Sequence, residues 1–474
     1  MDQTDLTIAY VGGGSRQWAP RLIQDLAVSP FDGTVRLYDV DVEAAETNAA
    51  FGDWVDDRPD ATADWSYVVE ADLDAALAGA DVVVLSTQYD PRETFVHDLD
   101  IPLEYGIHGA VSATIGPGGI MRAMRTIPQY RRFARAIRDQ CPDAWVCVYT
   151  NPIHFVTRAL YDEFPDINAI GLCHEVAGTR RHLAAIASAA WDREYDASDV
   201  RDTVTGINHF TWLTDVRIGG RDLRPVLEKR ARSPAANRRF TPAELADESP
   251  FVDNWQVTWE LFRRFDALPA AGDRHLVEYA TWFLRGGAET LARWGVKRTG
   301  SDYRSTHWTP ADSEQTTDVT AWMRGEAPFE LTRSDEVFVD VVAGLCGEDE
   351  FVTNVNLPNR GQVPDLPAEV AVETNAIVRA DGITPLTADP LPRAAAGLVR
   401  DHVETIESVI AASRTGDVDA AFAGLLTDAQ VRTCSPDDAR DMFVDLVDAQ
   451  RDYLEDWDLA AADVLADAGA GCKS

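Results

Sequence analysis

The sequence predicts an α/β fold, in which a Rossmann-like, doubly wound parallel sheet is followed by an α+β domain. Three observations support this prediction. An apolar run, Leu6–Val11, leads into a glycine-rich turn and then into apolar residues at helical spacing. Strand-like and helix-like segments alternate over the first 200 residues, as in repeated β-α units. Beyond residue 200 strands and helices are mixed, so we expect two domains, residues 1–200 and 201–474.

The elements of the first domain follow from short apolar runs and helical periodicities. After 6–11 we expect strands at 35–38, 81–86, 145–149 and 169–173, and helices at 43–55, 121–138 and 180–190. The carboxyl ends of parallel strands gather ligands at one edge of such a sheet. Chemistry-bearing residues at these strand ends are therefore the first candidates for a site.

The second domain has a less regular pattern. Residues 203–218 read as long strand material with a break at Asn208-His209, and 337–345 and 369–378 read as further strands. Residues 392–413 and 436–465 read as long helices. We expect this domain to lie over the carboxyl edge of the first sheet.

The composition is strongly acidic. Asp and Glu number 79 against 43 Lys and Arg, which gives a net charge of −36 over 474 residues. Such a surface repels nucleic acid and anionic membranes, so we expect neither as a partner. Only three of the basic residues are Lys. This composition is typical of a protein from a salt-rich cytoplasm, where salt screens self-repulsion, or of an acidic protein whose genome favours Arg.

The location is predicted from what the chain does not contain. No run of about 18 apolar residues occurs, so no transmembrane helix is expected. The first residues carry no basic segment typical of a secretory signal. The six cysteines form no CxxC pair, which favours a reducing compartment. We therefore expect a cytoplasmic protein.

The turn after the first strand predicts a dinucleotide site. Gly12 and Gly14 supply a GxG pattern, although Gln17 stands where a third glycine is usual. Asp39 ends the next strand, where a carboxylate accepts from ribose hydroxyls and repels a 2′-phosphate, so NAD+ is favoured over NADP+. The predicted cofactor site comprises Gly12, Gly13, Gly14, Ser15, Asp39 and Thr87. The alternative is a tight turn beside a surface acid.

Cysteine and histidine residues predict a metal site. Cys173 and His174 follow a predicted strand, and His209 lies at the break in the second domain. A thiolate and an imidazole are ligands for first-row transition metals, and two protein ligands leave positions for substrate. Taken singly, Cys173 could be a packed thiol and His209 a core histidine. The segment 272–279 adds polar candidates, of which Glu278 could equally be a helix charge.

Several motifs in order resemble one known family, the NAD-dependent glycoside hydrolase family 4. They are IAYVGGGS at 8–15, TIGPGG at 114–119 with MRTIP at 124–128, TNP at 150–152, GLCHEV at 171–176, GINHF at 206–210, HLVEYATWF at 275–283 and VNLPNRGQVPDLPAEVAVE at 355–373. Together they span some 370 residues. The resemblance implies a fold whose second domain is like that of lactate and malate dehydrogenases.

The resemblance also implies an unusual reaction. In this family NAD+ oxidises carbon 3 of the sugar, a base removes the proton on carbon 2, the glycosidic oxygen leaves, water adds and the hydride returns. A divalent metal, usually Mn2+, stabilises the charge that develops on the sugar oxygens. The implied metal ligands are Cys173 and His209, and the implied base is Asp273, with Tyr279 as second choice. Asn151, Arg122 and His174 would contact the substrate, and His174 could instead assist the leaving group.

The sugar is less closely defined. His174 resembles the members that act on non-phosphorylated α-glycosides, and Glu175, if it points inward, would disfavour an anionic uronide. We therefore expect an α-linked neutral hexoside, with a hexuronide as close competitor, and a homodimer or homotetramer by analogy with the family. Two alternatives remain open: an NAD-dependent dehydrogenase acting on a sugar or hydroxy acid, and a nucleotide-sensing protein without turnover.

Overall fold

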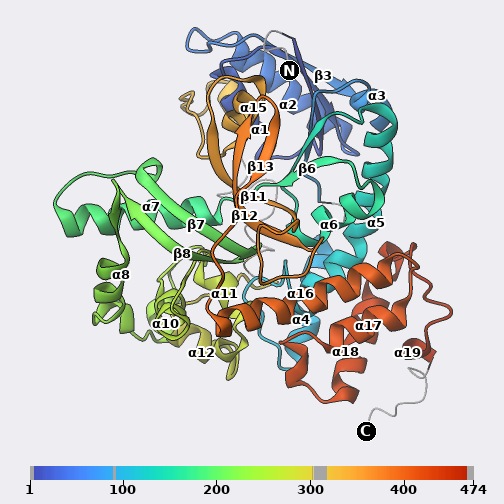
Figure 1. Ribbon diagram of the computed structural model, residues 1–474. Helices are drawn as coiled ribbons and strands as arrows, with labels where there is room; N and C mark the ends of the chain where they lie inside the picture. Colours follow the sequence, from blue (N-terminus) through green and yellow to red (C-terminus); the bar gives the residue numbers. More distant parts are fainter. Residues whose placement is uncertain (1–4, 89–91, 302, 304–317, 467–474) are drawn as a thin grey trace.

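The computed structural model describes residues 5–88, 92–301, 303 and 318–466. Its main element is a nine-stranded sheet of order β13-β12-β11-β6-β5-β4-β1-β2-β3 (Figure 1). The parallel strands are β1 Leu6–Val11, β2 Gly33–Tyr38, β3 Trp65–Glu70, β4 Val82–Leu85, β5 Trp145–Val148 and β6 Asn168–Gly171. Three antiparallel strands from the second half of the chain extend it: β11 Phe351–Pro358, β12 Ala371–Arg379 and β13 Gly382–Pro385.

The sheet is buried on both faces, as expected for a doubly wound fold. Alternate residues of β4 show this, because Val82 and Val84 pack with one hydrophobic cluster and Val83 and Leu85 with the other. The first cluster includes α1 Trp18–Ala27, α2 Val42–Asp56 and α15 Phe338–Cys346. The second includes α4 Arg92–Glu104, α5 Gly116–Gln140, α6 Ile153–Glu163 and α16 Arg393–Ser413.

A smaller lobe projects beside the main sheet, at the left of Figure 1. Its centre is a hairpin of β7 Val200–Ile207 and β8 Phe210–Ile218, joined by β9 Arg221–Asp222 and β10 Leu268–Pro269. The flanking helices are α7 Glu175–Trp191, α8 Arg224–Ala231 and α10 Gln256–Phe265. These helices and the strands share one hydrophobic cluster, so the lobe has a core of its own.

The hairpin turn and the following short helix place residues at the edge of the main sheet. The β7–β8 turn consists of Asn208 and His209, which confirms the predicted break. α11 Asp273–Tyr279 lies below it, and β12 packs closely against β7. Of the last helices, α17 Val418–Leu426 packs against α16 and α5, and α18 Pro436–Ala449 packs against α4 and α5. The short helix α19 Asp463–Ala466 packs against α17 and α18.

The predicted fold class is confirmed, and two element predictions are wrong. Residues 337–345 form helix α15 instead of a strand, because Phe338, Val341 and Leu345 bury one helical face against the sheet. Residues 436–465 do not form one helix, since α18 ends at Ala449 and a short 3-10 turn follows. Among the described residues no helix is both long and apolar enough to cross a membrane.

Candidate active site

The glycine turn after β1 forms a cradle against the neighbouring strands. Gly12 has a φ of +97°, and a Cβ there would lie 2.1 Å from the Ser86 carbonyl oxygen. A Cβ on Gly14 would lie 2.9 Å from the Asp39 carboxylate, which accepts a hydrogen bond from the Gly14 N–H at 2.9 Å. Ser15 Oγ accepts from the Trp18 N–H at 3.1 Å, at the start of α1. This close backbone approach and the acid at the end of β2 fit a dinucleotide.

The ends of β4 and β5 continue the same edge. The Thr87 N–H donates to Thr150 Oγ1 at 2.8 Å, and this hydroxyl donates to the Thr87 carbonyl at 3.0 Å. The next residue, Asn151, has a buried Oδ1 without a hydrogen-bond partner in the described part of the chain. The structure therefore brings Thr87 and Asn151 to adjacent strand ends and leaves the Asn151 oxygen available to a ligand.

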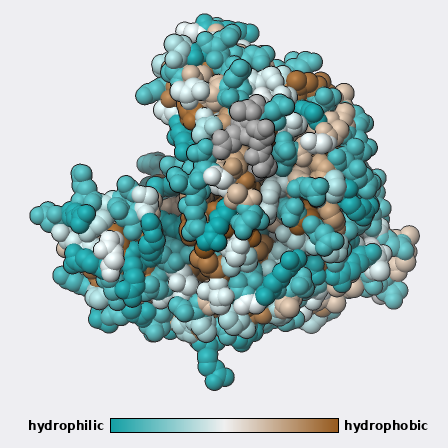
Figure 2. Space-filling view, turned by 45° about the horizontal axis from the view of Figure 1, so that its top comes forward, coloured by the Kyte–Doolittle hydropathy of each residue, from teal (hydrophilic) through white to brown (hydrophobic). Residues whose placement is uncertain are grey.

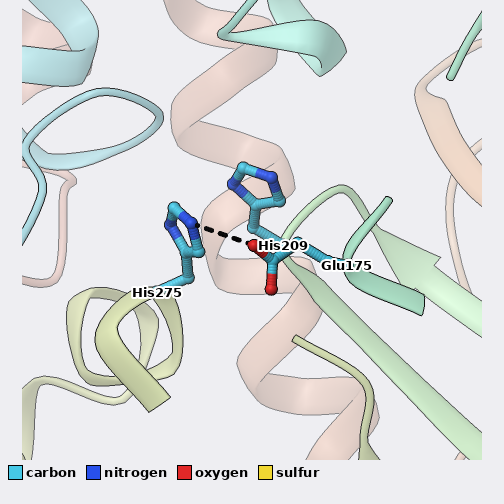
Figure 3. Close-up of side chains that lie close together, drawn as sticks. All are labelled: Glu175, His209 and His275. Carbon is cyan, nitrogen blue, oxygen red and sulfur yellow. Dashed lines mark ion pairs between the residues drawn. The ribbon is translucent and has the colours of Figure 1, made fainter. Parts of the chain in front are cut away.

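Cys173 and His209 lie together, although 36 residues separate them. Cys173 follows β6 and His209 occupies the β7–β8 turn, and Cys173 Sγ lies 3.3 Å from His209 Nε2. Glu175 and His275 complete the group, because one ligand atom from each of Glu175, His209 and His275 lies within 4.8 Å of the others (Figure 3). His275 Nε2 is 3.5 Å from Glu175 Oε1, and the His209 and His275 rings are 4.0 Å apart.

The electrostatics of this group suit a cation. Burial raises the pKa of the Cys173 thiol well above its usual value, and the carboxylates of Glu373 and Glu175 raise it further. Burial lowers the pKa of His209 well below its usual value, and it also lowers the pKa of His275. The imidazoles are thus held neutral, which is the form that binds metal.

The donor set fits a transition metal. It combines one thiol, two imidazoles and one carboxylate, of which both histidines are buried. Nδ1 of His209 and Nδ1 of His275 are buried without a hydrogen-bond partner among the described residues. The other ring nitrogens, Nε2 of both histidines, lie beside the Cys173 thiol and the Glu175 carboxylate, which brings together donor types that a first-row transition metal prefers. Cys173, His209, Glu175 and His275 could hold such an ion.

The two candidate bases are already engaged. The Asp273 carboxylate, 2% exposed, accepts from the backbone N–H groups of Val257 and Thr258 at 3.0 and 2.8 Å and so caps α10. Burial raises the pKa of Asp273 to about 6. Tyr279 Oη donates to the Asn208 carbonyl at 3.0 Å, and burial raises its pKa. The role of either residue as base stays a prediction.

His174 and Arg122 lie in different surroundings. The His174 side chain is half-exposed, its ring lies 6.1 Å from that of Trp18, and its Nδ1 is 4.0 Å from Glu336 Oε1. It therefore stands between the dinucleotide turn and the Cys173–His209 pair. Arg122 is buried on α5 with its guanidinium 4.7 Å from the Phe95 ring. Arg122 thus lies on a different element from Cys173, His174 and His209.

A cavity of about 590 Å³ opens beside this group. It is bounded by the first turns of α7, by the segments 250–255 and 295–297, and by the start of α11, and it reaches His174 and Glu175. Its basic side chains are Arg181, Arg274 and Lys297. Figure 2 shows a mainly hydrophilic face in which hydrophobic side chains gather in the hollow between the projecting lobe and the body.

Sequence reasoning did not assign several residues of this site. His275 was one polar candidate among others, and the Glu175 carboxylate was considered only for its effect on the sugar. Glu373, a buried acid on β12, was not singled out, although it lies in a recognised motif. The clustering of Arg181 and Arg274 depends on the packing of α7 against the start of α11, for which the sequence carries no local signal.

Comparisons with known proteins agree with this geometry. The family models described as "Family 4 glycosyl hydrolase" and "Family 4 glycosyl hydrolase C-terminal domain" match residues 7–189 and 204–431. An alpha-galacturonidase of Thermoanaerobacterium saccharolyticum is 36% identical over 468 residues, which cover 96% of this chain and 98% of the relative.

Solved structures are similar as well. A putative glucosidase from Bacillus subtilis has a TM-score of 0.85 and 35% identity, over 94% of this chain and all of the other. The 6-phospho-beta glucosidase of Thermotoga maritima, solved with manganese, NAD+ and glucose-6-phosphate, has a TM-score of 0.72 at 18% identity over 94% and 99% of the two chains, and this likeness supports the fold alone. The dehydrogenase alternative is not favoured. This chain belongs to family 4 of the glycosyl hydrolases, an NAD-dependent family of glycosidases.

Proposed function

We propose that this protein is an α-galacturonidase that uses NAD+ and a divalent metal such as Mn2+. The observation that carries the proposal is the cavity beside the candidate metal group, whose lining includes three basic side chains. In a chain with 79 acidic and 43 basic residues, Arg181, Arg274 and Lys297 line one cavity that reaches His174 and Glu175. Guanidinium groups recognise carboxylates with paired hydrogen bonds, so this lining suits the carboxylate of a uronide.

The acids of the cavity do not cancel this preference. Asp273 accepts the backbone N–H groups of α10, and burial together with that neighbour raises the pKa of Asp253 well above its usual value. Glu175 accepts from the Gly272 N–H at 2.7 Å and lies 3.9 Å from Arg274 Nη2. Glu175 points inward, the condition under which we expected it to disfavour a uronide, but its charge is offset by Arg274 and by the Gly272 N–H. With that carboxylate engaged, a uronide replaces the neutral hexoside as our preferred substrate.

The alpha-galacturonidase relative supports the same choice, because it aligns over nearly the whole chain. The Thermotoga maritima structure was solved with manganese and NAD+, and these two cofactors suit the candidate metal group and the glycine turn of this chain. When bound, NAD+ would accept and return the hydride of carbon 3, and the metal would polarise the oxygens on carbons 2 and 3.

The residues of this chain would supply binding and orientation. Gly12 and Gly14 would admit the pyrophosphate, with Asp39 on the ribose hydroxyls, and Ser15 and Thr87 would border the dinucleotide. Cys173 and His209, with Glu175 and His275, would hold the metal. Asn151 would direct its unpaired Oδ1 to a sugar hydroxyl. His174, half-exposed between the two sites, would face the leaving group.

The experiment is a substrate panel with each cofactor omitted in turn. Purified protein in molar KCl with a reductant receives p-nitrophenyl α-galacturonide, α-glucuronide, α-galactoside, α-glucoside and a 6-phosphoglucoside. We expect nitrophenol from the galacturonide, dependent on both NAD+ and Mn2+, with no net NADH. Release from only neutral or phosphorylated glycosides would refute the uronide assignment. Accumulation of NADH without release would show a dehydrogenase.

We also propose properties that follow from the sequence and the family. The chain would divide near residue 200, as the separate family models at 7–189 and 204–431 suggest. It would act in the cytoplasm as a homodimer or homotetramer, without nucleic acid or membrane as partner. Size-exclusion chromatography with light scattering tests the oligomer, and a monomer at assay concentration would refute it.

A further inference from the structure

A buried carboxylate lies behind the candidate metal group and touches neither cavity nor solvent. Glu373 on β12 is 1% exposed. Its Oε1 accepts from Asn354 Nδ2 at 2.7 Å, and its Oε2 accepts from Asn208 Nδ2 at 3.2 Å. Both amides donate, so the carboxylate is fully engaged by two segments that are 146 residues apart in sequence. Burying a carboxyl group costs desolvation energy, so the two hydrogen bonds of Glu373 require an explanation.

The two amides lead to the two candidate metal ligands. Asn208 directly precedes His209 in the β7–β8 turn. Asn354 Nδ2 also approaches the backbone carbonyl of Cys173 at 3.5 Å. Glu373 thus joins, through one amide on each side, the loop that carries the thiol and the turn that carries the imidazole.

The turn needs such a support. His209 has a φ of +60°, which side-chain-bearing residues seldom adopt, and Gly206 has a φ of +134°. A two-residue turn in this state presents its second side chain toward Cys173 Sγ at 3.3 Å. The Asn208 side chain bonds to Glu373, and its carbonyl accepts from Tyr279 Oη at 3.0 Å. The turn is therefore held from two sides.

We propose that Glu373 is a positioning residue that fixes the Cys173 loop and the His209 turn so that thiol and imidazole bind one metal ion. The inference rests on the metal assignment of the proposed function. Carboxylates that hydrogen-bond around a metal site orient the ligands, and their loss weakens metal affinity about 10- to 100-fold. Glu373 acts one step further out, through the two amides.

Arg180 holds the Asn354 side chain from the side opposite Glu373. It lies on α7, two turns after Cys173, and donates to Asn354 Oδ1 at 3.2 Å and to Asp202 at 2.7 Å. Asn354 therefore has its amide orientation fixed at both ends, with its oxygen toward the guanidinium and its nitrogen toward Glu373. This orientation requires an acceptor at position 373.

The test compares metal affinity with fold stability in the full-length protein. In E373Q the new amide places a donor against one of the two Asn donors while the volume is kept. The matched control is D162N on α6, whose carboxylate accepts from Arg131 at 2.8 Å and Arg414 at 2.7 Å and lies at the other end of the helix from the site. We measure the Mn2+ Kd by titration calorimetry, the Mn2+ electron paramagnetic resonance spectrum, and the Tm without metal.

We expect E373Q to weaken Mn2+ binding about tenfold, the lower end of the range for groups bonded directly to ligands, and to alter the Mn2+ spectrum. D162N should lower the Tm but leave the Mn2+ Kd unchanged. N354A, which removes one of the two donors, should weaken binding by a smaller factor and decides the matter if E373Q does not fold. A Kd within twofold of wild type in the folded variants overturns the inference. Failure of the wild-type protein to bind Mn2+ overturns the metal assignment and this inference with it, whatever the substrate panel shows.

Discussion

Replacing Arg274 with Gln tests whether this side chain of the cavity binds the carboxylate of the substrate. The Arg274 side chain is 23% exposed, its Nη2 lies 3.9 Å from Glu175 Oε1, and its guanidinium lies 4.6 Å from the Phe251 ring. It is thus pre-positioned in a partly desolvated wall. A hydrogen bond to a charged group contributes about 1.5–3 kcal/mol, and partial exposure favours the lower end. Since 1.4 kcal/mol is tenfold, we expect kcat/KM for the galacturonide to fall about tenfold.

The assay uses two substrates that differ only at carbon 6. R274Q should lose activity on p-nitrophenyl α-galacturonide and change little on the α-galactoside, so the ratio of the two kcat/KM values should fall about tenfold. The control is R217Q, because Arg217 is half-exposed on β8 and pairs with Asp215 away from the cavity. The Mn2+ Kd is measured in parallel, since Arg274 also approaches Glu175. An equal loss on both substrates with unchanged metal affinity would refute the reasoning.

Four further outcomes are expected. C173S should weaken Mn2+ binding at least 100-fold by calorimetry. The wild-type thiol has a raised pKa and must lose its proton to bind the metal, so the Mn2+ affinity of the wild-type protein should increase with pH. D39N should weaken NAD+ binding about tenfold by fluorescence titration, because a charge-assisted contact becomes neutral. Burial raises the folded-state pKa of Asp273 from 3.8 to about 6, so this carboxyl contributes stability below pH 4 that is lost as the pH rises through 6. D273N should therefore flatten the dependence of the Tm on pH between 4 and 6. An unchanged Tm profile together with a loss of proton exchange at carbon 2 would favour the role of Asp273 as base. With a net charge of −36, the Tm should rise with KCl up to molar concentrations, and a Tm independent of salt would contradict the salt-adapted prediction.

The first domain was predictable because its signals are local. The apolar run before Gly12, the helical spacing after it and the acid at Asp39 all lie between residues 6 and 39, so each signal is local. The strand ends at Thr87, Asn151 and Cys173 followed once the parallel order was assumed, since parallel strands share one carboxyl edge. Burial on both faces accounts for the apolar character of these strands.

The errors arose where tertiary contacts decide between two local states. The segment FVDVVAGLC of α15 is rich in Val, and a short apolar run does not distinguish a strand from a buried helix. Its helical form depends on α1 and on the strands β11 and β12 that it covers. The antiparallel extension of the main sheet depends likewise on pairing between Asn356 and Gly171, which are 185 residues apart.

The candidate site shows the same division. Cys173 and His209 could be chosen from sequence because each lies at a strand end or turn. His275, Glu175 and Glu373 gain meaning only from their distances, because α11, α7 and β12 converge from three separate parts of the chain. The sequence of a motif does not indicate whether a carboxylate in it faces a metal, a substrate or a backbone amide.

The placement of the candidate metal ligands couples the two halves of the chain. Cys173 follows the last parallel strand of the main sheet, whereas His209 belongs to the hairpin of the smaller lobe and His275 to the helix beneath it. Neither part holds the whole candidate donor set, so a metal bound there would stabilise their contact as well as each loop. β12 reinforces this contact, because it belongs to the main sheet, packs against β7 and carries Glu373 between the two ligand-bearing segments. A change at this junction should therefore alter metal affinity and the joint stability of both halves together, whereas a change at the far end of either half should alter stability alone.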